Sequence, residues 1–395
     1  MGFRKLKPEI LVLMSVSMSN EVYITNISRF LPNKPVSNDE MEDYLGMINN
    51  RPSKARRIVL RNNGIVNRHY ALEKGGKITH SNAELAAAAV NLLFDDRFKK
   101  ENVQLLASGT ASPDQIMPSQ ASMIHGLLDI PSVEIASFSG SCCASMQALK
   151  FCYLSVLSGN TGNAVCTASE IFSHWMLSKY FEKETENESK LKDNPLLAFE
   201  KEFLRWMLSD GAGAVLLENK PFGKQPLRIE WIDIRSYANI KETCMYAGAD
   251  KGSNGELLGW CRFEPEDWLN KSIFSLKQDT RMLGEFIVKL GGQFLKEIIE
   301  ERNFNIESID YFLPHLSSEF FREPIYKELS NLNIHIPKEK WFTNLSTAGN
   351  VATVSFILML EELIRTRDLK KGQKILIQVP ESARFTYAYA LFTVC

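Results

Sequence analysis

The amino-acid sequence predicts an α/β fold in which two halves of similar topology follow one another. Two observations support this prediction. Patterns typical of helices and strands alternate along the chain, which favours parallel or mixed sheets covered by helices. A series of helix, strand, extended segment, turn, helix and strand also occurs twice, and four elements of the second series begin about 207 to 210 residues after their counterparts.

The first series follows a predicted strand at residues 21–25, where polar and apolar residues alternate. Its members are a helix at 83–94, strands at 103–107 and 133–137, a helix at 143–157 and a strand at 164–168. The first of these helices is amphipathic, because its apolar residues fall on one face: Leu85, Ala89, Leu92 and Leu93.

The second series begins after residues 221–226, which contain two prolines and precede a strand at 227–231. Its members are a helix at 285–299, a strand at 310–313, an extended segment at 341–344, a helix at 351–364 and a strand at 374–379. We therefore divide the chain into an N-terminal extension and two halves: residues 1–17, 18–222 and 223–395. The charged stretch 183–194 is predicted to be an exposed insertion.

Composition excludes several classes of protein. The chain has 395 residues, of which 45% are hydrophobic, so it can bury a large core. With a net charge of −1 it offers no basic field for nucleic acid. The seven cysteines lack the C-x-x-C spacing of zinc or redox sites, so we expect reduced thiols, no metal and a cytoplasmic protein. The apolar run at 10–14 is short for a signal peptide, and no stretch predicts a membrane span.

The strongest chemical motif is the pair Cys142 and Cys143, which lies between a strand and a helix. A thiol at the N-terminus of a helix is stabilised as thiolate by the helix dipole and the free N–H groups. The same N–H groups can stabilise an oxyanion after attack on a thioester. The motif therefore predicts a nucleophile, and the alternative is a pair of packing thiols beside small residues.

Two further motifs could complete such a site. His315 follows an apolar strand and a proline, at the end of a strand where α/β proteins place active-site loops. Asn350 begins the predicted helix 351–364 and holds the place in the second half that the cysteine turn holds in the first. The alternatives are a histidine with a structural hydrogen bond and an ordinary N-cap asparagine.

Two weaker motifs concern phosphate binding. The glycine-rich sequence at 210–215 precedes a strand and does not join a strand to a helix, so we interpret it as a tight turn packed near the core. Arg57 and Arg61 lie in a basic cluster that could receive a phosphate of coenzyme A or of a phosphopantetheine arm. A solvated basic face is the alternative.

Taken together, these residues resemble the ketoacyl synthase III branch of the thiolase superfamily, over about residues 22–394. The matching pieces are Asn63-Gly64-Ile65, Arg68-His69, the cysteine turn with Ala148-Leu149, Asp210 to Ala214, Pro314-His315, Gly349-Asn350 and Phe385-Thr386-Tyr387. The resemblance implies a thiolase-like, five-layered α/β/α/β/α fold with duplicated halves, and a homodimer.

The resemblance also implies roles for single residues. The acylated nucleophile falls on Cys142, with Cys143 as the fallback, and His315 and Asn350 would hydrogen-bond a thioester carbonyl. Met117 would close the acyl tunnel of the dimer partner. The backbone N–H groups of Cys142 and Ala383 would form the oxyanion hole.

The sequence departs from the family's pattern in two places. The family's glycine-rich loop is replaced at residues 380–385, where Glu381 and Arg384 bring charge close to the site. The segment 171–209 is longer than expected, so we expect a remodelled pocket entrance.

Finer features resemble bacterial ketosynthases of dialkylresorcinol and stilbene biosynthesis. They are Leu31-Pro32-Asn33, the sequence 38–41, the sequence 61–64 and the paired cysteines. This implies that acyl groups from carrier-protein or coenzyme A thioesters are joined to a β-ketoacyl thioester and cyclised to a 1,3-cyclohexanedione, with Glu381 as a candidate base and no cofactor. The alternatives are initiation of fatty acid or polyketide synthesis with malonyl-carrier protein, acyl transfer to an alcohol or amine, and a non-catalytic partner subunit.

Overall fold

The computed structural model describes residues 21–182, 203–252 and 254–395. The predicted N-terminal extension, residues 1–17, and the predicted charged insertion, residues 183–194, lie outside the described residues. The exact division of the chain into two halves stays a prediction, although strand pairing shows clearly how the two series of elements are related.

The first series forms five strands in the order β5-β4-β6-β7-β1. Their bounds are β1 (Tyr23–Phe30), β4 (Leu105–Thr110), β5 (Glu134–Ser139), β6 (Asn163–Glu170) and β7 (Gly211–Glu218). Strands β5, β4 and β6 are parallel, whereas β7 is antiparallel to both of its neighbours, β6 and β1. Across the sheet, the neighbouring strands are therefore the third, second, fourth, fifth and first of these five in the order of the chain.

The second series repeats this arrangement. Its strands stand in the order β13-β14-β15-β8. Their bounds are β8 (Leu227–Ser236), β13 (Tyr311–Pro314), β14 (Lys374–Glu381) and β15 (Thr386–Val394). Strand β15 is the antiparallel member. The predicted extended segment 341–344 is reduced to one parallel bridge between Trp341 and Phe312, but it stands where β5 stands in the first half. The predicted duplication is thus confirmed.

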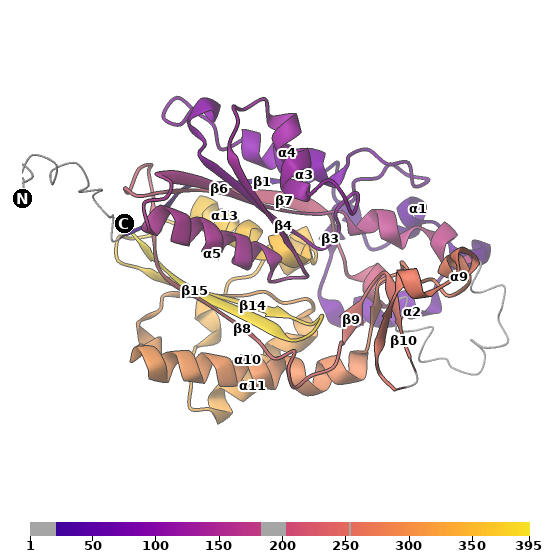
Figure 1. The fold of residues 1–395 in the computed structure, drawn as a ribbon. Helices are drawn as coiled ribbons and strands as arrows, with labels where there is room; N and C mark the ends of the chain where they lie inside the picture. Colours follow the sequence, from indigo (N-terminus) through magenta and orange to yellow (C-terminus); the bar gives the residue numbers. More distant parts are fainter. Residues whose placement is uncertain (1–20, 183–202, 253) are drawn as a thin grey trace, which may run out of the picture.

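The two sheets are joined edge to edge, because β1 pairs with β8 at two positions, Tyr23 with Arg228 and Ile24 with Leu227. Figure 1 shows five layers, as predicted: helices, sheet, helices, sheet, helices. The outer layers are α3 (Asn82–Asn91) with α4 (Gln120–Leu128) and α10 (Thr280–Arg302) with α11 (Arg322–Asn331). Between the sheets lie α5 (Ala144–Leu157) and α13 (Ser355–Thr366).

Local sequence explains where the outer helices begin. Ser81 caps α3 by accepting from the N–H of Glu84, whose side chain accepts in return from the N–H of Ser81. Asp279 accepts from the N–H of Met282 at the start of α10. The central helix α5 has no such side-chain cap of its own. Its N-terminus is therefore available to other groups.

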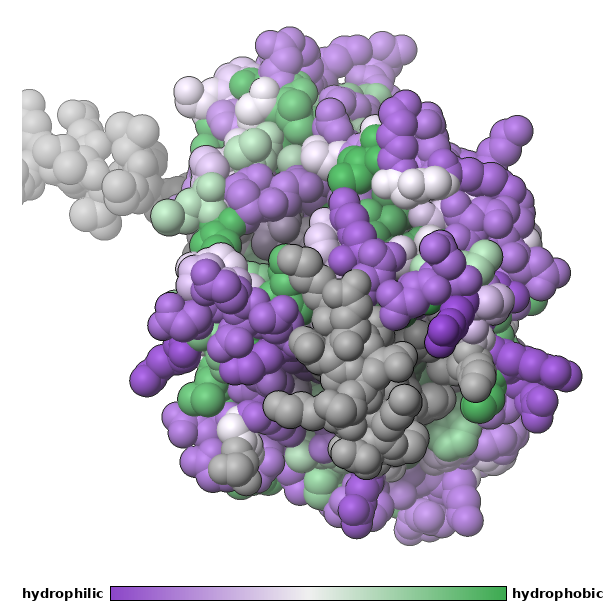
Figure 2. Space-filling model, turned by 90° about the vertical axis from the view of Figure 1, so that its right-hand side faces the viewer, coloured by the Kyte–Doolittle hydropathy of each residue, from purple (hydrophilic) through white to green (hydrophobic). Residues whose placement is uncertain are grey.

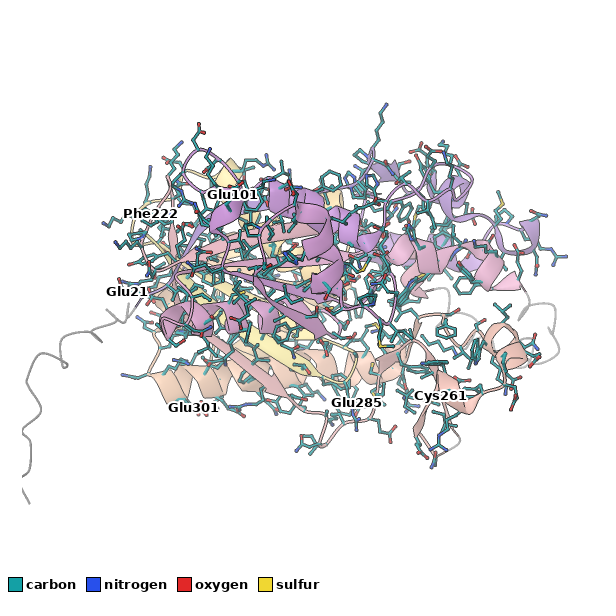
Figure 3. All side chains as sticks on the ribbon, turned by 45° about the horizontal axis from the view of Figure 1, so that its top comes forward. Glu21, Glu101, Phe222, Cys261, Glu285 and Glu301 are labelled. Carbon is teal, nitrogen blue, oxygen red and sulfur yellow. The ribbon has the colours of Figure 1, made fainter. Side chains whose placement is uncertain are left out.

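Residues 237–252 and 254–279 form a lobe outside the two sheets. It contains β9 (Met245–Tyr246), β10 (Ala249–Lys251), β11 (Leu257–Gly259), α9 (Pro265–Asn270) and β12 (Lys277–Gln278). The exposed Cys261 lies on this lobe, beyond the helix that carries Glu285 (Figure 3). Figure 2 faces the same end of the molecule, where hydrophilic side chains predominate over small apolar patches.

The sequence interpretation of residues 210–215 is wrong. Gly211, Gly213 and their neighbours belong to the fully buried strand β7 and do not form a tight turn. A Cβ atom on Gly213 would lie 2.6 Å from Cγ2 of Ile357, so the glycine permits helix α13 to pack closely on the sheet. In the described part of the chain, no helix is long and apolar enough to cross a membrane.

Candidate active site

The cysteine turn lies between the two sheets. Strand β5 ends at Ser139 and helix α5 begins at Ala144, so Cys142 and Cys143 occupy the connection. Both are buried. Burial and the nearby charge of Glu381 raise the pKa of Cys142 to about 12, so the resting side chain is a thiol. The expectation that the helix would favour a thiolate is therefore wrong for this state, because desolvation outweighs the helix terminus.

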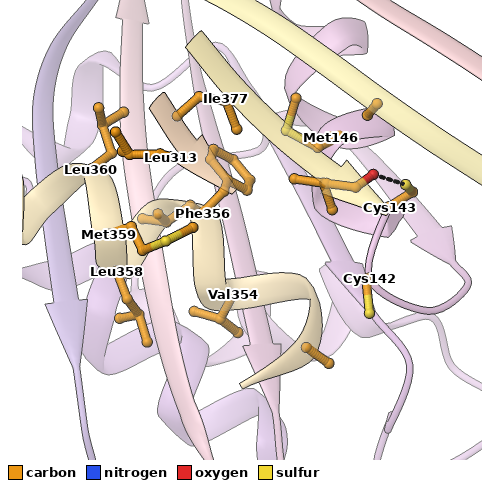
Figure 4. Packing of buried hydrophobic residues seen from close by; sticks show 14 of the residues in the cluster. Cys142, Cys143, Met146, Leu313, Val354, Phe356, Leu358, Met359, Leu360 and Ile377 are labelled. Atoms are coloured by element: carbon orange, nitrogen blue, oxygen red, sulfur yellow. Dashed lines mark hydrogen bonds between the residues drawn. The ribbon is translucent and has the colours of Figure 1, made fainter. Parts of the chain in front are cut away.

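The two cysteine side chains point in different directions (Figure 4). The thiol of Cys143 donates to the carbonyl oxygens of Val379 at 3.3 Å and Thr386 at 3.6 Å. The sulfur of Cys142 lies 3.7 Å from the hydroxyl of Ser141, and Cys142 lines a cavity that Cys143 does not reach. The geometry therefore favours Cys142 as the reactive sulfur.

Gly109 determines how closely helix α5 approaches the sheet. A Cβ atom there would lie 2.6 Å from the backbone of Ala144 and Ser145, immediately after the two cysteines. We expect Gly109→Ala to lower the free energy of unfolding by about 2 to 3 kcal/mol through overpacking, and to slow acylation because the turn is displaced. Urea denaturation measures the first effect.

A matched control is Gly126→Ala in α4, where a Cβ atom would meet nothing within 4 Å. Because alanine favours the helix, this variant should be as stable as the parent or gain about 0.5 to 1 kcal/mol. Equal stability of the two variants would contradict the packing argument.

His315 lies directly after β13 and lines the same cavity as Cys142. The backbone N–H of His315 donates to the carbonyl oxygen of Gln378 at 2.8 Å, and this bond fixes the loop. Its Nε2 atom is buried and has no hydrogen-bond partner in the described chain. Burial lowers the pKa of His315 to about 4, so the imidazole is neutral at physiological pH. A neutral ring protonated at Nε2 would donate into the cavity.

This shift makes stability depend on pH. The unfolded state takes up a proton below about 6.5 and the folded state only below about 4, so folding loses stability as the pH falls between these values. Between pH 7.5 and pH 5 the wild-type protein should lose about 2 kcal/mol more of its free energy of unfolding than His315→Gln does. Urea denaturation at both pH values measures this difference. His335→Gln, at an exposed histidine, should show no such difference. Parallel behaviour of the two variants would refute the neutral, buried state.

Asn350 is held by its backbone. Its N–H donates to the carbonyl oxygen of Met207 and its carbonyl oxygen accepts from the N–H of Ser209. The side-chain Oδ1 accepts from the N–H of Ala352 at 3.0 Å, which leaves the amide nitrogen to donate elsewhere. Asn350 does not begin the helix as predicted, because α13 starts only at Ser355.

Thr353 links the asparagine turn to the cysteine turn. Its hydroxyl donates to the carbonyl oxygen of Cys142 at 3.2 Å and accepts from the N–H of Ser145 at 2.8 Å. The structure thus brings together the turns of Cys142, His315 and Asn350, although Asn350 does not line the cavity that the other two share.

Two cavities meet at the cysteine turn. The small one measures about 40 Å³, room for about three water molecules, and is lined by Cys142 and His315. The large one measures about 850 Å³ and reaches Ser141, Glu381 and Ala383. Its walls are rich in aromatic side chains: Phe172, Trp175, Tyr180, Tyr246, Trp260, Trp268 and Phe274. Such a volume is sufficient for an organic group of considerable size.

The segment 380–383 separates these cavities. Pro380 and Ser382 line the small cavity, whereas Glu381 and Ala383 line the large one. The carbonyl oxygen of Ala383 accepts from the N–H groups of Cys244 and Met245. Ala383 lines the large cavity together with Ser141 of the cysteine turn, but it does not line the small cavity of Cys142. Its part in an oxyanion hole therefore stays a prediction.

The remaining predicted residues lie at the surface. Met117 is 82% exposed and follows Ile116, which lines the large cavity. Arg57 and Arg61 are exposed on α2 (Lys54–Asn63). The end of this helix is bound to the loop beside the small cavity, because the hydroxyl of Ser318 donates to the carbonyl oxygen of Asn62.

Glu170 is a residue that sequence reasoning missed. It is completely buried at the end of β6, accepts from the hydroxyl of Ser112 at 2.6 Å and from the N–H of Ala111 at 3.2 Å, and has its pKa raised by burial to about 8. Its charge contributes to the raised pKa of Cys142. Its place, a carboxyl group at the end of a strand beside the cysteine turn, was the signal that could have revealed it.

Comparisons with known proteins find similarity along most of the chain. The C-terminal domain of 3-oxoacyl-[acyl-carrier-protein (ACP)] synthase III matches residues 299–387. A beta-ketoacyl-[acyl-carrier-protein] synthase III of Clostridium perfringens is 23% identical over 349 residues, which cover 88% of this chain and 92% of that protein. The corresponding protein of Clostridium acetobutylicum is 24% identical over 365 residues, covering 91% and 94%.

Solved structures share the fold. The tetronic acid condensing enzyme AbyA1 has a TM-score of 0.73 at 21% identity, covering 94% of this chain and 99% of the other. A variant of Xanthomonas campestris OleA has a TM-score of 0.73 at 18% identity, covering 95% and 99%. The fold and the site thus define a thiolase-fold protein. Within that fold the chain is similar to beta-ketoacyl-ACP synthase III condensing enzymes, both along most of its length and in its C-terminal residues 299–387.

Proposed function

We propose that this protein is a ketosynthase that takes an acyl group onto Cys142 and joins it to the α-carbon of a second thioester. The observation that supports this proposal most directly is the shared small cavity. It is lined by the thiol of Cys142 and by the buried, neutral imidazole of His315, while Cys143 is turned away towards backbone carbonyls. The substrates would be thioesters of an acyl carrier protein or of coenzyme A.

In the first step the sulfur of Cys142 attacks the thioester carbonyl. A carbon–sulfur bond forms to Cys142, the bond to the carrier sulfur breaks, and the carrier thiol leaves with the proton of the cysteine. Because Cys142 rests as a thiol, its proton has to be lost before or during the attack. The backbone N–H of Cys142 has no hydrogen-bond partner on another described residue and would donate to the oxyanion.

In the second step a β-ketoacyl thioester would lose an α-proton, which the two adjacent carbonyl groups already make acidic. His315 and Asn350 would donate hydrogen bonds to the enolate oxygen. The carbanion attacks the acyl carbonyl on Cys142, the new carbon–carbon bond forms, and the carbon–sulfur bond breaks. The thiolate of Cys142 leaves and takes up the proton that the α-carbon lost, so the free thiol is restored. The scheme uses no metal and no redox cofactor.

Cyclisation of the product to a 2,5-disubstituted 1,3-cyclohexanedione, a dialkylresorcinol or stilbene precursor, would need a further base. Two buried carboxyl groups lie beside the cysteine turn, Glu381 and Glu170, and burial raises the pKa of both. We retain Glu381 as the proposed base because it also lines the large cavity, where a long acyl group has room. If Glu170→Gln forms only linear products while Glu381→Gln still cyclises, the base is Glu170.

A second candidate is condensation with malonyl-carrier protein, which starts a fatty acid or polyketide chain. It is favoured by the relatives that are beta-ketoacyl-[acyl-carrier-protein] synthase III proteins. We also propose a cytoplasmic homodimer, in which the exposed Met117 would reach the large cavity of the partner and Arg57 and Arg61 would receive the phosphate of the carrier arm.

Product analysis tests the proposal. The protein is incubated with an unsaturated acyl thioester together with either a β-ketoacyl or a malonyl thioester, and the products are identified by mass spectrometry. A cyclohexanedione from the β-ketoacyl pair supports the ketosynthase–cyclase. If only linear products form, the protein does not catalyse the cyclisation. If product forms with the malonyl thioester and not with the β-ketoacyl thioester, the second candidate is supported. Transfer of the acyl group to an added alcohol or amine, without a new carbon–carbon bond, would replace both by an acyltransferase.

A further inference from the structure

The carboxylate of Glu381, in the second half of the protein, accepts hydrogen bonds from the cysteine turn in the first half. Glu381 is the last residue of β14, and its Oε2 atom accepts from the N–H of Ser141 at 3.3 Å and from the N–H of Cys143 at 3.1 Å. These two N–H groups flank Cys142. A single oxygen atom thus holds both sides of the residue proposed as the nucleophile.

This contact adds to the capping of α5, whose own N-cap residue, Cys143, contributes no side-chain hydrogen bond. N–H groups at the start of a helix need acceptors, and a negative charge is favoured at this end. Thr353 accepts from the N–H of Ser145 within the first turn. Glu381, which is 238 to 240 positions away in sequence, adds a carboxylate at the N–H groups just before it.

The contact occupies two N–H groups of the turn and leaves a third without a partner in the described chain. Those of Ser141 and Cys143 are bound to Glu381, whereas that of Cys142 has no partner on another described residue. The one group left free belongs to the residue that lines the small cavity with His315. An oxyanion formed on a group bound to Cys142 could therefore accept from this N–H without competition.

We propose that Glu381 is a positioning residue for Cys142, whose carboxylate binds the two flanking N–H groups and so holds the turn with the N–H of Cys142 free. The proposal rests on the proposed function only in taking Cys142 as the nucleophile. It gives Glu381 a part in acyl transfer, which is separate from any part in cyclisation.

The charges around the thiol decide how its reactivity depends on pH. Glu381 and Glu170 raise the pKa of Cys142 by their negative charge, in addition to burial. On the other sides lie His315, which is neutral, and the buried thiol of Cys143. Neither cavity is lined by a described lysine or arginine. Removing one carboxylate should therefore make Cys142 easier to ionise.

Three variants separate position from charge. Glu381→Gln keeps an acceptor oxygen and loses the charge, whereas Glu381→Ala loses both. Glu170→Gln removes the charge that Glu170 carries above its pKa of about 8, but leaves the bonds to Ser141 and Cys143 intact. Each variant is measured for alkylation of Cys142 by iodoacetamide as a function of pH, for acyl transfer from an acyl thioester, and for amide hydrogen exchange of the segment 139–146.

Glu381→Ala should exchange the amides of this segment about tenfold faster or more, and should lose about 10- to 100-fold in acyl transfer, because charge-assisted hydrogen bonds are lost. Its alkylation, which needs no oxyanion donor, should not fall. Glu381→Gln should keep acyl transfer within a few-fold and should alkylate faster at pH 7.5. Because the pKa of Glu170 is about 8, Glu170→Gln should alkylate faster than the wild-type protein only above about pH 8. Thermal unfolding of each variant shows that the comparison is made between folded proteins.

The exchange measurement does not depend on the reaction. If the wild-type protein takes no acyl group from any thioester, the proposed function fails, while faster exchange in Glu381→Ala and not in Glu381→Gln still supports the positioning role. Equal exchange in all variants, or equal loss of alkylation and acyl transfer in Glu381→Ala, would overturn it. Should Glu381→Ala fail to fold, an acyl transfer rate in Glu381→Gln that falls as far as in Cys142→Ala would overturn it as well.

Discussion

Cys142→Ala should abolish the covalent acyl adduct that the wild-type protein forms with acyl thioesters. Removing a nucleophile from a working site costs at least about 10³-fold in rate, because no neighbouring group can replace it. Here Cys143 is the only other described sulfur in the turn, and its thiol is bound to the carbonyl oxygens of Val379 and Thr386. Intact-protein mass spectrometry after incubation with a thioester measures the adduct directly.

Cys143→Ala is the matched control, since it removes the neighbouring sulfur and leaves Cys142 in the small cavity. This variant should still be acylated, with some loss of stability from the small void that it creates. An adduct that survives Cys142→Ala and disappears in Cys143→Ala would move the nucleophile by one residue. Failure of the wild-type protein to form any adduct would remove the enzyme proposal altogether.

His315→Ala should lower the rate of carbon–carbon bond formation by about 10²- to 10³-fold, as expected for the loss of one donor to a developing oxyanion. Acylation of Cys142 should persist, because in the proposed mechanism His315 acts on the enolate of the second substrate. Product formation under conditions that saturate acylation separates the two steps. Since His315 is neutral above pH about 4, its titration should not appear in the pH profile between pH 6 and 8.

His335→Ala provides the control, because His335 is exposed and lies outside both cavities. It should condense at the wild-type rate. A variant of His315 that is acylated and also condenses normally would exclude the imidazole from the chemistry. A variant that loses acylation as well would place His315 in the first step.

The fold could be predicted because its periodic patterns are local. The helix predicted at 143–157 is α5 at Ala144–Leu157, and the strand predicted at 374–379 is β14 at Lys374–Glu381. The duplication was visible because two units with the same strand order keep nearly the same spacing between elements. The prediction failed at 210–215, where glycines usual in turns serve the close packing of a buried strand.

The site was only partly predictable. The motifs of Cys142, His315 and Asn350 stood out because unusual residues follow strands, and the structure brings their turns together. The direction of the Cys142 and Cys143 side chains could not be predicted, because it depends on backbone angles within one turn. Nor could the grip of Glu381 on this turn, since about 240 residues separate the partners and only the complete fold brings them into contact.

The alternation of side chains across residues 380–383 has a consequence for how such proteins diversify. A mutation at Ser382 changes the wall of the small cavity, whereas a mutation at the next residue, Ala383, changes the wall of the large one. Natural selection can therefore alter one compartment at a time. Under the proposed function, substitutions in the large cavity would change which acyl group fits while the sulfur of Cys142 keeps its surroundings.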